Sequence, residues 1–296
     1  MAIVSPGINV LRVLTTNQCN HRCWFCHNEG QISTEPQFLN PQSFSGIVAA
    51  AYCLGIRQIQ FSGGEPTLHP AFEDLVRTAQ NHAPRVGIGM ATNGSCLTET
   101  LIQYVSPIMN NIRVNLPSLS LERYVQITGV GDLERVLDSV ELLIHHGASV
   151  GLNTVYCNQS LDEIMALIGF AAAHEIDLKI LEWIKPDDWQ SSPSAAKLCQ
   201  ELEVRAWHSG CLAQSVRQFL IPVGRKTARV RVILTPCRAR LSSACQEYGE
   251  VRLLPNLHLQ GCVLPGSHTL QINSASATAI ITAFKQASQA IGRCPS

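Results

Sequence analysis

The stretch TTNQCNHRCWFCHNEG, residues 15–30, decides how this chain is interpreted, because it holds three cysteines in the spacing C-x3-C-x2-C. They are Cys19, Cys23 and Cys26. Three thiolates on one short loop can ligate three irons of a 4Fe–4S cluster and leave the fourth iron to a small molecule that chelates it. A zinc knuckle is the main alternative, but zinc sites normally show two Cys/His pairs, and no second pair stands nearby. We therefore expect a catalytic 4Fe–4S cluster on this loop.

Composition narrows the class of protein. Of the 296 residues, 46% are hydrophobic and 15% charged, which allows a large core. Lys plus Arg and Asp plus Glu both number 22, without a basic run, so we expect no nucleic-acid partner. The N-terminus lacks a signal peptide and no long apolar run exists, so we expect no membrane partner. Twelve cysteines without a secretion signal indicate a cytoplasmic location. The sequence leaves the oligomeric state open.

Short apolar runs alternate with amphipathic segments of helical length, which is typical of β/α units and a parallel sheet. Strands are expected at 9–16, 57–66, 86–94, 111–119, 149–156 and 178–185, and helices at 41–54, 70–82, 98–106, 133–147 and 161–175. Six repeats over about 10–185 are too few for a closed eight-stranded barrel. The predicted fold class is therefore α/β, a partial (β/α)6 TIM-like open barrel.

A Ser/Pro/Asp-rich stretch at 186–194 is the predicted linker to a C-terminal extension. We predict a barrel domain over 8–188 and an extension over 189–296. The extension is expected to contain helices at 194–208 and 275–291, strands at 219–223 and 229–237, and a hairpin at 250–262.

The second strand ends in the turn Gly63-Gly64-Glu65-Pro66. A glycine pair lets the backbone approach a ligand closely, and a carboxylate can accept hydrogen bonds from an ammonium. Together, the cysteine loop and this turn resemble the radical S-adenosylmethionine superfamily. The resemblance implies that the open iron chelates the amino and carboxylate groups of S-adenosylmethionine. It also implies that the Gly-Gly-Glu turn holds the amino group and that Phe25 lies beside the adenine ring.

The chain is similar in more detail to the GTP cyclase of molybdenum-cofactor biosynthesis, over roughly 8–185. The shared stretches are LRVLTTNQCNHRCWFCHNEG, FSGGEPTLHP, ATNG, the RVN of NIRVNLPSL, ERYVQITG and GLNTV. This likeness implies that Thr92, Ser118 and Asn153 contact S-adenosylmethionine, although Pro117 occupies the position of the relatives' serine. Thr92 and Asn153 could instead cap turns at strand ends.

A second cysteine set, Cys237, Cys245 and Cys262, lies in the C-terminal third, at about 230–265. In the GTP cyclases an auxiliary cluster uses C-x2-C-x13-C. Cys245 and Cys262 align with its first and last cysteines, and Tyr248 falls at the middle one. The resemblance therefore implies an auxiliary, twitch-like extension with a second 4Fe–4S cluster, for which Cys237 supplies the missing thiolate. Cys294 and Cys211 are candidates for a fourth ligand; incidental thiols are the alternative.

The positions that would bind a triphosphate differ from those of the cyclases. Where the cyclases carry basic residues, this chain has Gln58, Gln60, His69 and Glu250. Two arginines of the cyclases are retained, Arg12 and Arg252, and these are the candidate substrate residues. Fewer fixed cations leave a triphosphate poorly compensated. We therefore expect a changed substrate.

Three functions stay open at this point. The first is a radical S-adenosylmethionine enzyme, a lyase or cyclase. It would abstract hydrogen and rearrange or cyclise a small molecule, such as a nucleoside, a nucleotide or another metabolite, and it would take electrons from a flavodoxin- or ferredoxin-type reductant. The second is a radical maturase of a ribosomal peptide. The cysteine loop argues against it, because the loop begins at residue 19 and we expect no leader-binding module before it. The third is a non-catalytic iron–sulfur protein.

Overall fold

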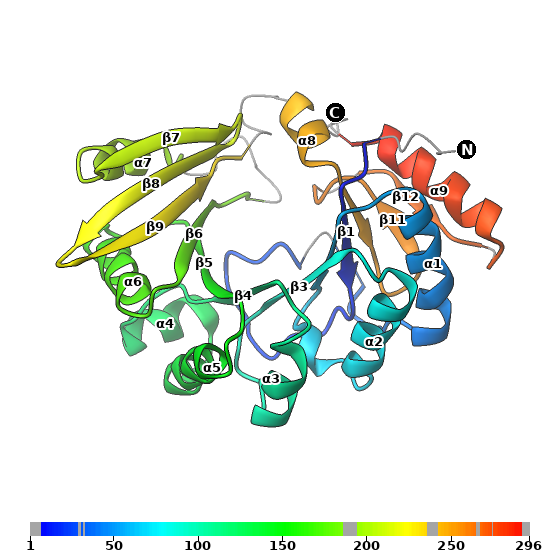
Figure 1. The fold of residues 1–296 in the computed structure, drawn as a ribbon, viewed down its shortest axis with the longest axis horizontal. Helices are drawn as coiled ribbons and strands as arrows, with labels where there is room; N and C mark the ends of the chain where they lie inside the picture. The colour runs from blue at the N-terminus through cyan, green and yellow to red at the C-terminus, as the bar shows by residue number, and fades with distance from the viewer. Residues whose placement is uncertain are drawn as a thin grey trace. The chain divides into compact units, whose positions relative to one another are not determined.

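The computed structural model describes residues 7–28, 31, 33–185, 194–235, 242–264, 267–273 and 275–291, which fold into two compact units. Unit 1 comprises Met1–Asn20, His27–Thr92 and Arg240–Ser296, and unit 2 comprises His21–Cys26 and Asn93–Ala239. Each unit has parallel strands extended by antiparallel ones, with helices beside them (Figure 1). Within the described ranges, no helix has the length and apolar character needed to cross a membrane.

The sheet of unit 1 has the order β12-β11-β10-β1-β2-β3. The central strand β1 pairs in parallel with β10 and β2, and β2 with β3, whereas β10, β11 and β12 pair antiparallel. The strands are β1 (Val10–Leu14), β2 (Gln58–Ser62), β3 (Gly87–Thr92), β10 (Glu250–Leu253), β11 (His258–Gln260) and β12 (Thr269–Gln271).

Three helices of unit 1, α1 (Pro41–Cys53), α2 (Phe72–His82) and α9 (Ala277–Gln289), lie beside this sheet (Figure 1). The side chain of Asn40 caps α1 by accepting from the next amides, as Pro41 at the first turn predicts. Phe61 of β2 packs against Phe44 of α1 and Phe72 of α2, with ring centroids 6.1 and 5.5 Å apart. One face of the sheet is therefore the apolar core of unit 1.

The sheet of unit 2 has the order β4-β5-β6-β9-β8-β7. Strands β4, β5, β6 and β9 pair in parallel, and β9, β8 and β7 pair antiparallel. The strands are β4 (Asn111–Asn115), β5 (Val150–Tyr156), β6 (Asp177–Glu182), β7 (His208–Ala213), β8 (Val216–Val223) and β9 (Lys226–Ile233). The helices are α3 (Glu99–Val105), α4 (Leu121–Thr128), α5 (Leu133–His145), α6 (Leu161–Ala173) and α7 (Ala196–Glu203).

The open α/β architecture and its six β/α repeats are confirmed, because the six expected strands are β1 to β6 and neither sheet closes on itself. Two local expectations are wrong. The helix expected at 194–208 ends at Glu203, and residues 208–213 form β7, whose backbone pairs with β8. The sequence also gave no warning of α4 or of α8 (Ser242–Tyr248). Most of the predicted linker, 186–193, lies outside the described residues.

The predicted domain boundary at residue 188 stays a prediction. Strands from beyond that position pair with strands of both units: β9 lies parallel to β6, and β10 lies parallel to β1. The compact units therefore divide the chain differently from a simple cut between barrel and extension.

Candidate functional site

The Gly-Gly-Glu turn of unit 1 packs directly on the backbone that leads into Cys19. Gly64 N donates to Thr16 O at 2.7 Å, and Glu65 N donates to Gln18 O at 2.7 Å. Gly63 has φ +134°, and a β-carbon at Gly64 would lie 2.0 Å from Gln18 O. The glycines were expected to let a ligand approach the backbone closely. In the structure they let residues 16–18 of the same chain approach closely.

The Glu65 carboxylate is held in one orientation by two threonines. Its Oε1 accepts from Thr92 Oγ1 at 2.7 Å, Thr67 Oγ1 at 2.6 Å and Thr67 N at 3.1 Å. Glu65 is only 1% exposed, so these bonds offset the cost of burying its charge. Thr92, at the end of β3, thus positions Glu65; its predicted contact with S-adenosylmethionine stays a prediction.

The cysteine loop belongs to both units, because Cys19 lies in unit 1 and Cys23 and Cys26 lie in unit 2. Cys19 and Cys26 are exposed, Cys23 is half-buried, and none of the three is in a disulfide. Cys26 N donates to Cys23 O at 3.0 Å, which closes a turn between them. Within the described residues, no three His, Cys, Asp or Glu side chains are gathered in a metal-binding arrangement. Accessible thiols on a short loop nevertheless fit an iron–sulfur cluster, and ligation by these cysteines stays a prediction.

Sequence reasoning missed a polar anchor for this loop. His21 Nε2 lies 2.9 Å from Asp132 Oδ2, and the Tyr124 hydroxyl donates to Asp132 Oδ1 at 3.1 Å. Burial, followed by the nearby Asp132 charge, raises the pKa of Tyr124, so this phenol stays a donor. Arg22 N adds a hydrogen bond to Thr128 O at 2.8 Å. The loop is thereby fixed to α4 and to the start of α5.

Phe25 lies in an apolar cluster with Ile127 and Cys157, and its side chain is 8% exposed. Trp183 packs against this cluster, and its Nε1 donates to Phe25 O at 2.9 Å. Burial raises the pKa of the Cys157 thiol to about 11, so it stays protonated at neutral pH. Cys157 is thus a packing residue. The adenine contact of Phe25 remains a prediction.

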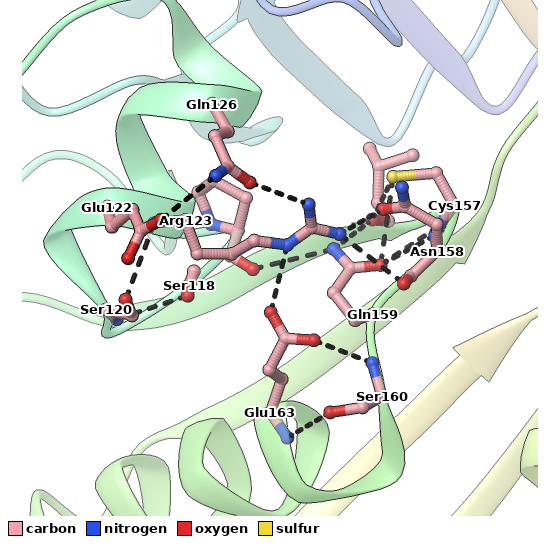
Figure 2. Close-up of polar contacts among 12 residues, drawn as sticks. Ser118, Ser120, Glu122, Arg123, Gln126, Cys157, Asn158, Gln159, Ser160 and Glu163 are labelled. Atoms are coloured by element: carbon pink, nitrogen blue, oxygen red, sulfur yellow. Dashed lines mark hydrogen bonds and ion pairs between the residues drawn. The ribbon is translucent and has the colours of Figure 1, made fainter.

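A hydrogen-bond network joins the loops that follow β4 and β5 in unit 2 (Figure 2). Arg123 on α4 donates through Nε to Glu163 at the start of α6, and through Nη2 to Asn158. Gln159, 4% exposed, donates to Pro117 O and to Val155 O. The two loops are therefore held in one fixed arrangement.

Ser118 and Asn153 have different surroundings in unit 2. Ser118 Oγ accepts from Ser120 N at 3.1 Å, which stabilises the turn before α4 (Figure 2). Asn153 Oδ1, on β5, is buried, and no described residue hydrogen-bonds it. A buried acceptor without a protein donor is typical of a position that a ligand or water completes. Asn153 therefore fits the predicted contact better than Ser118 does.

The second cysteine set is only partly described. Cys237 and the alternative ligand Cys294 lie outside the described residues. Cys245 is half-buried on α8, and Cys262 follows β11 and accepts from Leu264 N at 3.5 Å. Cys211 is exposed on β7 in unit 2. The auxiliary cluster stays a prediction.

The candidate substrate residues Arg12 and Arg252 share one carboxylate. Arg12 Nη2 lies 2.8 Å from Glu250 Oε2, and Arg252 Nη2 lies 2.6 Å from Glu250 Oε1. From the sequence, both arginines are expected to match cationic residues of the cyclases. The ion pairs of both arginines with Glu250 were not expected.

The family of this chain follows from comparison with known proteins. Residues 13–171 match the model of the radical SAM superfamily, which covers more than half of the chain. The chain belongs to this superfamily. Membership implies a 4Fe–4S cluster and S-adenosylmethionine as cofactors, and it accounts for the cysteine loop and the Gly-Gly-Glu turn together.

The curated relatives are cyclases. A probable GTP 3',8-cyclase of Thermococcus kodakarensis is 29% identical, with 94% of this chain and 93% of the relative covered. GTP 3',8-cyclase 2 of Pseudomonas aeruginosa is 30% identical over 67% of this chain and 61% of that protein. The family and these relatives indicate an enzyme of the cyclase or lyase type, as expected from the sequence.

Solved structures agree on the fold. Streptococcus suis SuiB bound to precursor peptide SuiA has a TM-score of 0.72 at 12% identity, covering 93% of this chain and 64% of SuiB. Native anSMEcpe with bound AdoMet has a TM-score of 0.50 at 16% identity, covering 61% of this chain and 57% of that one. The chain thus spans less than two thirds of these structures, and the likeness concerns their fold alone.

Proposed function

We propose that this chain is a radical S-adenosylmethionine enzyme that abstracts hydrogen from a small molecule other than GTP, and that rearrangement or cyclisation follows. The observation that carries the proposal is the buried Glu65 carboxylate. Thr67 and Thr92 orient it, on a turn hydrogen-bonded to the backbone immediately before Cys19. A buried, oriented carboxylate beside a cysteine loop suits the binding of an ammonium group.

Each residue has a distinct role in this proposal. Cys19, Cys23 and Cys26 hold the cluster, Glu65 binds the amino group of S-adenosylmethionine, and Thr92 keeps Glu65 in place. When bound, the two cofactors supply a 5′-deoxyadenosyl radical. Asn153 offers its buried Oδ1 to the cofactor, while Phe25 and Ser118 complete the contacts that the resemblance implies.

We also propose a second 4Fe–4S cluster on Cys237, Cys245 and Cys262. The support is the alignment of Cys245 and Cys262 with the auxiliary motif of the GTP cyclases, together with their half-buried placement in unit 1. An external one-electron reductant of the flavodoxin or ferredoxin type completes the system. Twelve cysteines and an oxygen-sensitive cluster suit a reducing compartment such as the cytoplasm.

We expect the reconstituted protein to form 5′-deoxyadenosine from S-adenosylmethionine and dithionite, but not to cyclise GTP. The reason is charge: Gln58, Gln60, His69 and Glu250 stand where, by the resemblance, the cyclases carry cations. Liquid chromatography of anaerobic reactions with and without GTP measures both products. A non-catalytic iron–sulfur protein forms no 5′-deoxyadenosine. A cyclised nucleotide formed at the rate of a dedicated enzyme would restore the usual activity of the relatives.

Glu65→Gln should weaken the binding of S-adenosylmethionine about tenfold or more, because a charge-assisted hydrogen bond is worth roughly 1.5–3 kcal/mol. Glutamine keeps the size of the side chain and the acceptor for the two threonines, so the iron content should not change. Anaerobic calorimetry measures the affinity. Glu73→Gln, the same substitution at an exposed position of α2, is the control. Equal affinities of the Glu65 variant and the unmodified protein would mean that the turn is structural only.

A further inference from the structure

Helix α4 of unit 2 binds the backbone of the cysteine loop directly. Thr128 O, at the end of the helix, accepts from Arg22 N at 2.8 Å, and Ile127 O accepts from Trp24 N at 3.2 Å. These bonds hold the loop on both sides of Cys23. The last turn of a helix has carbonyl groups without partners in the helix, so a neighbouring loop can bind them. The end of α4 therefore fixes this part of the loop.

The side chain of Tyr124, on the same helix, adds a second anchor for the loop. Its hydroxyl donates to Asp132 Oδ1 at 3.1 Å, and Asp132 Oδ2 lies 2.9 Å from His21 Nε2. Tyr124 is 0% exposed, so its ring is held by packing and its hydroxyl by a hydrogen bond. Backbone and side-chain contacts thus place the loop at 21–26 against α4.

The neighbouring residue Arg123 binds another part of unit 2, the loop after β5 and the start of α6 (Figure 2). Its Nε lies 3.1 Å from Glu163 Oε1, and its Nη2 donates to Asn158 O at 3.4 Å and to Asn158 Oδ1. Glu163 is fixed in turn, because its Oε2 accepts from Ser160 N at 2.7 Å. Arg123 therefore ties α4 to the residues that follow β5.

An apolar contact joins the helix, the loop and the end of β5. Ile127 of α4 packs with Phe25 of the loop and with Cys157, the residue after β5. Asn153 lies four positions before Cys157, and no described residue hydrogen-bonds its buried Oδ1. The position of Asn153 relative to the cysteine loop therefore depends on α4.

A network that only stabilises the fold is the alternative. The side chains of Arg123 and Glu163 are 24% and 27% exposed, and ion pairs with this much solvent contact contribute little to stability. A stabilising role explains each contact singly. It does not explain why two adjacent residues of one helix bind the loop that carries Cys23 and Cys26 and the strand end that carries Asn153.

We propose that α4 sets the separation between the catalytic cluster and the S-adenosylmethionine contact on β5. Tyr124 positions the cysteine loop, and Arg123 positions the end of β5. The inference rests on the proposed function, in which S-adenosylmethionine contacts both the cluster and Asn153. A molecule held at two points needs them at a fixed separation, because a shift of either point weakens one of the contacts. Arg123 and Tyr124 are positioning residues, since both act through other groups.

Two substitutions on α4 separate these roles. Arg123→Gln should weaken S-adenosylmethionine binding about tenfold, the size expected for the loss of a charge-assisted bond. It should leave the iron content and the EPR spectrum of the reduced cluster unchanged when S-adenosylmethionine is absent. Tyr124→Phe removes only the hydroxyl. It should make the loss of iron to a chelator about tenfold faster, as for other groups that orient metal-binding residues. Anaerobic calorimetry, EPR and chelator kinetics are the measurements.

Arg205→Gln is the matched control, because it removes the same charge from the Arg205–Glu201 pair beside α7. It should change neither readout. The proposal is overturned if Arg123→Gln binds S-adenosylmethionine as well as Arg205→Gln does. It is also overturned if Arg123→Gln loses iron as fast as Tyr124→Phe, because general loosening of the fold would change both readouts together. Unchanged iron loss in Tyr124→Phe removes the role of α4 in positioning the loop.

If Arg123→Gln does not fold, Arg123→Lys decides by the same criteria, since lysine keeps the charge but cannot make all of these contacts. Failure of the proposed function gives a different result. An unmodified protein that assembles its cluster but binds no S-adenosylmethionine refutes the proposed function, and this inference with it. Normal binding by the unmodified protein and by the Arg123 variant refutes the inference alone.

Discussion

Replacing Cys19, Cys23 and Cys26 together with alanine is expected to remove about four irons per chain and to abolish 5′-deoxyadenosine formation. The three thiolates stand in the C-x3-C-x2-C spacing that suits three irons of one cluster. Two of them are exposed, and backbone bonds fix the loop between them, so the site is accessible and ordered. Iron analysis and Mössbauer spectroscopy after anaerobic reconstitution measure the loss.

The control is Cys53→Ala, at an exposed cysteine at the end of α1. It should keep the full iron content and activity. The irons that remain in the triple variant also test the second cluster: about four more irons per chain should persist and should disappear when Cys237, Cys245 and Cys262 are replaced as well. Full cleavage of S-adenosylmethionine by the first triple variant would refute the assignment of the catalytic cluster.

The fold was predictable where the apolar pattern of a segment and the rules of β/α connection indicate the same arrangement. The apolar runs that became β1 to β6 are bounded by glycine, proline and asparagine signals, and right-handed β/α connections leave few ways to arrange them. The failure at residues 204–213 has a physical cause. The strand β7 is mostly exposed, so its sequence shows no alternation of apolar and polar residues. Pairing with β8 stabilises it instead.

The cysteine loop and the turn were predictable because each is a short contiguous motif. Contacts between distant residues were not. His21 reaches Asp132 across 111 positions, and Arg12 reaches Glu250 across 238. The sequence supplies the charges of such pairs but not their register, which only the paired strands β1 and β10 determine. The sequence therefore showed Glu250 only as a residue that replaces a cation of the cyclases. In the structure it also forms ion pairs with both Arg12 and Arg252.

The Gly-Gly-Glu turn shows how a motif serves two purposes. Thr92 and Glu65 were expected to touch the cofactor independently, yet they form one hydrogen-bonded unit. The glycines were assigned to ligand approach, yet they permit contact with residues 16–18. Backbone packing of this kind leaves no trace in composition or periodicity. It makes the placement of Cys19 depend on a turn more than forty residues away in the sequence.

Gly64→Ala is therefore expected to destabilise the protein by about 3 kcal/mol, near the upper end of the usual cost of overpacking. The added β-carbon would meet Gln18 O at 2.0 Å and Gln18 C at 2.4 Å, and backbone atoms cannot rotate away as a side chain does. Relief requires the turn and the segment at 16–18 to separate. That separation breaks the bonds from Gly64 N to Thr16 O and from Glu65 N to Gln18 O. Chemical denaturation of the reconstituted protein measures the loss.

The matched control is Gly169→Ala in the helix α6, where no atom other than the helix's own nearby backbone lies within 4 Å of the added carbon. Alanine replaces glycine in a helix interior there, so stability should rise by roughly 0.5–1 kcal/mol. The two variants add the same methyl group and differ only in what it meets. If the turn positions the cysteine loop, Gly64→Ala should also lower the iron content after reconstitution, whereas Gly169→Ala should not. Equal stability of the Gly64 variant and the unmodified protein would contradict the close packing of turn and loop. A destabilised Gly64 variant with full iron content would separate the turn's structural role from cluster binding.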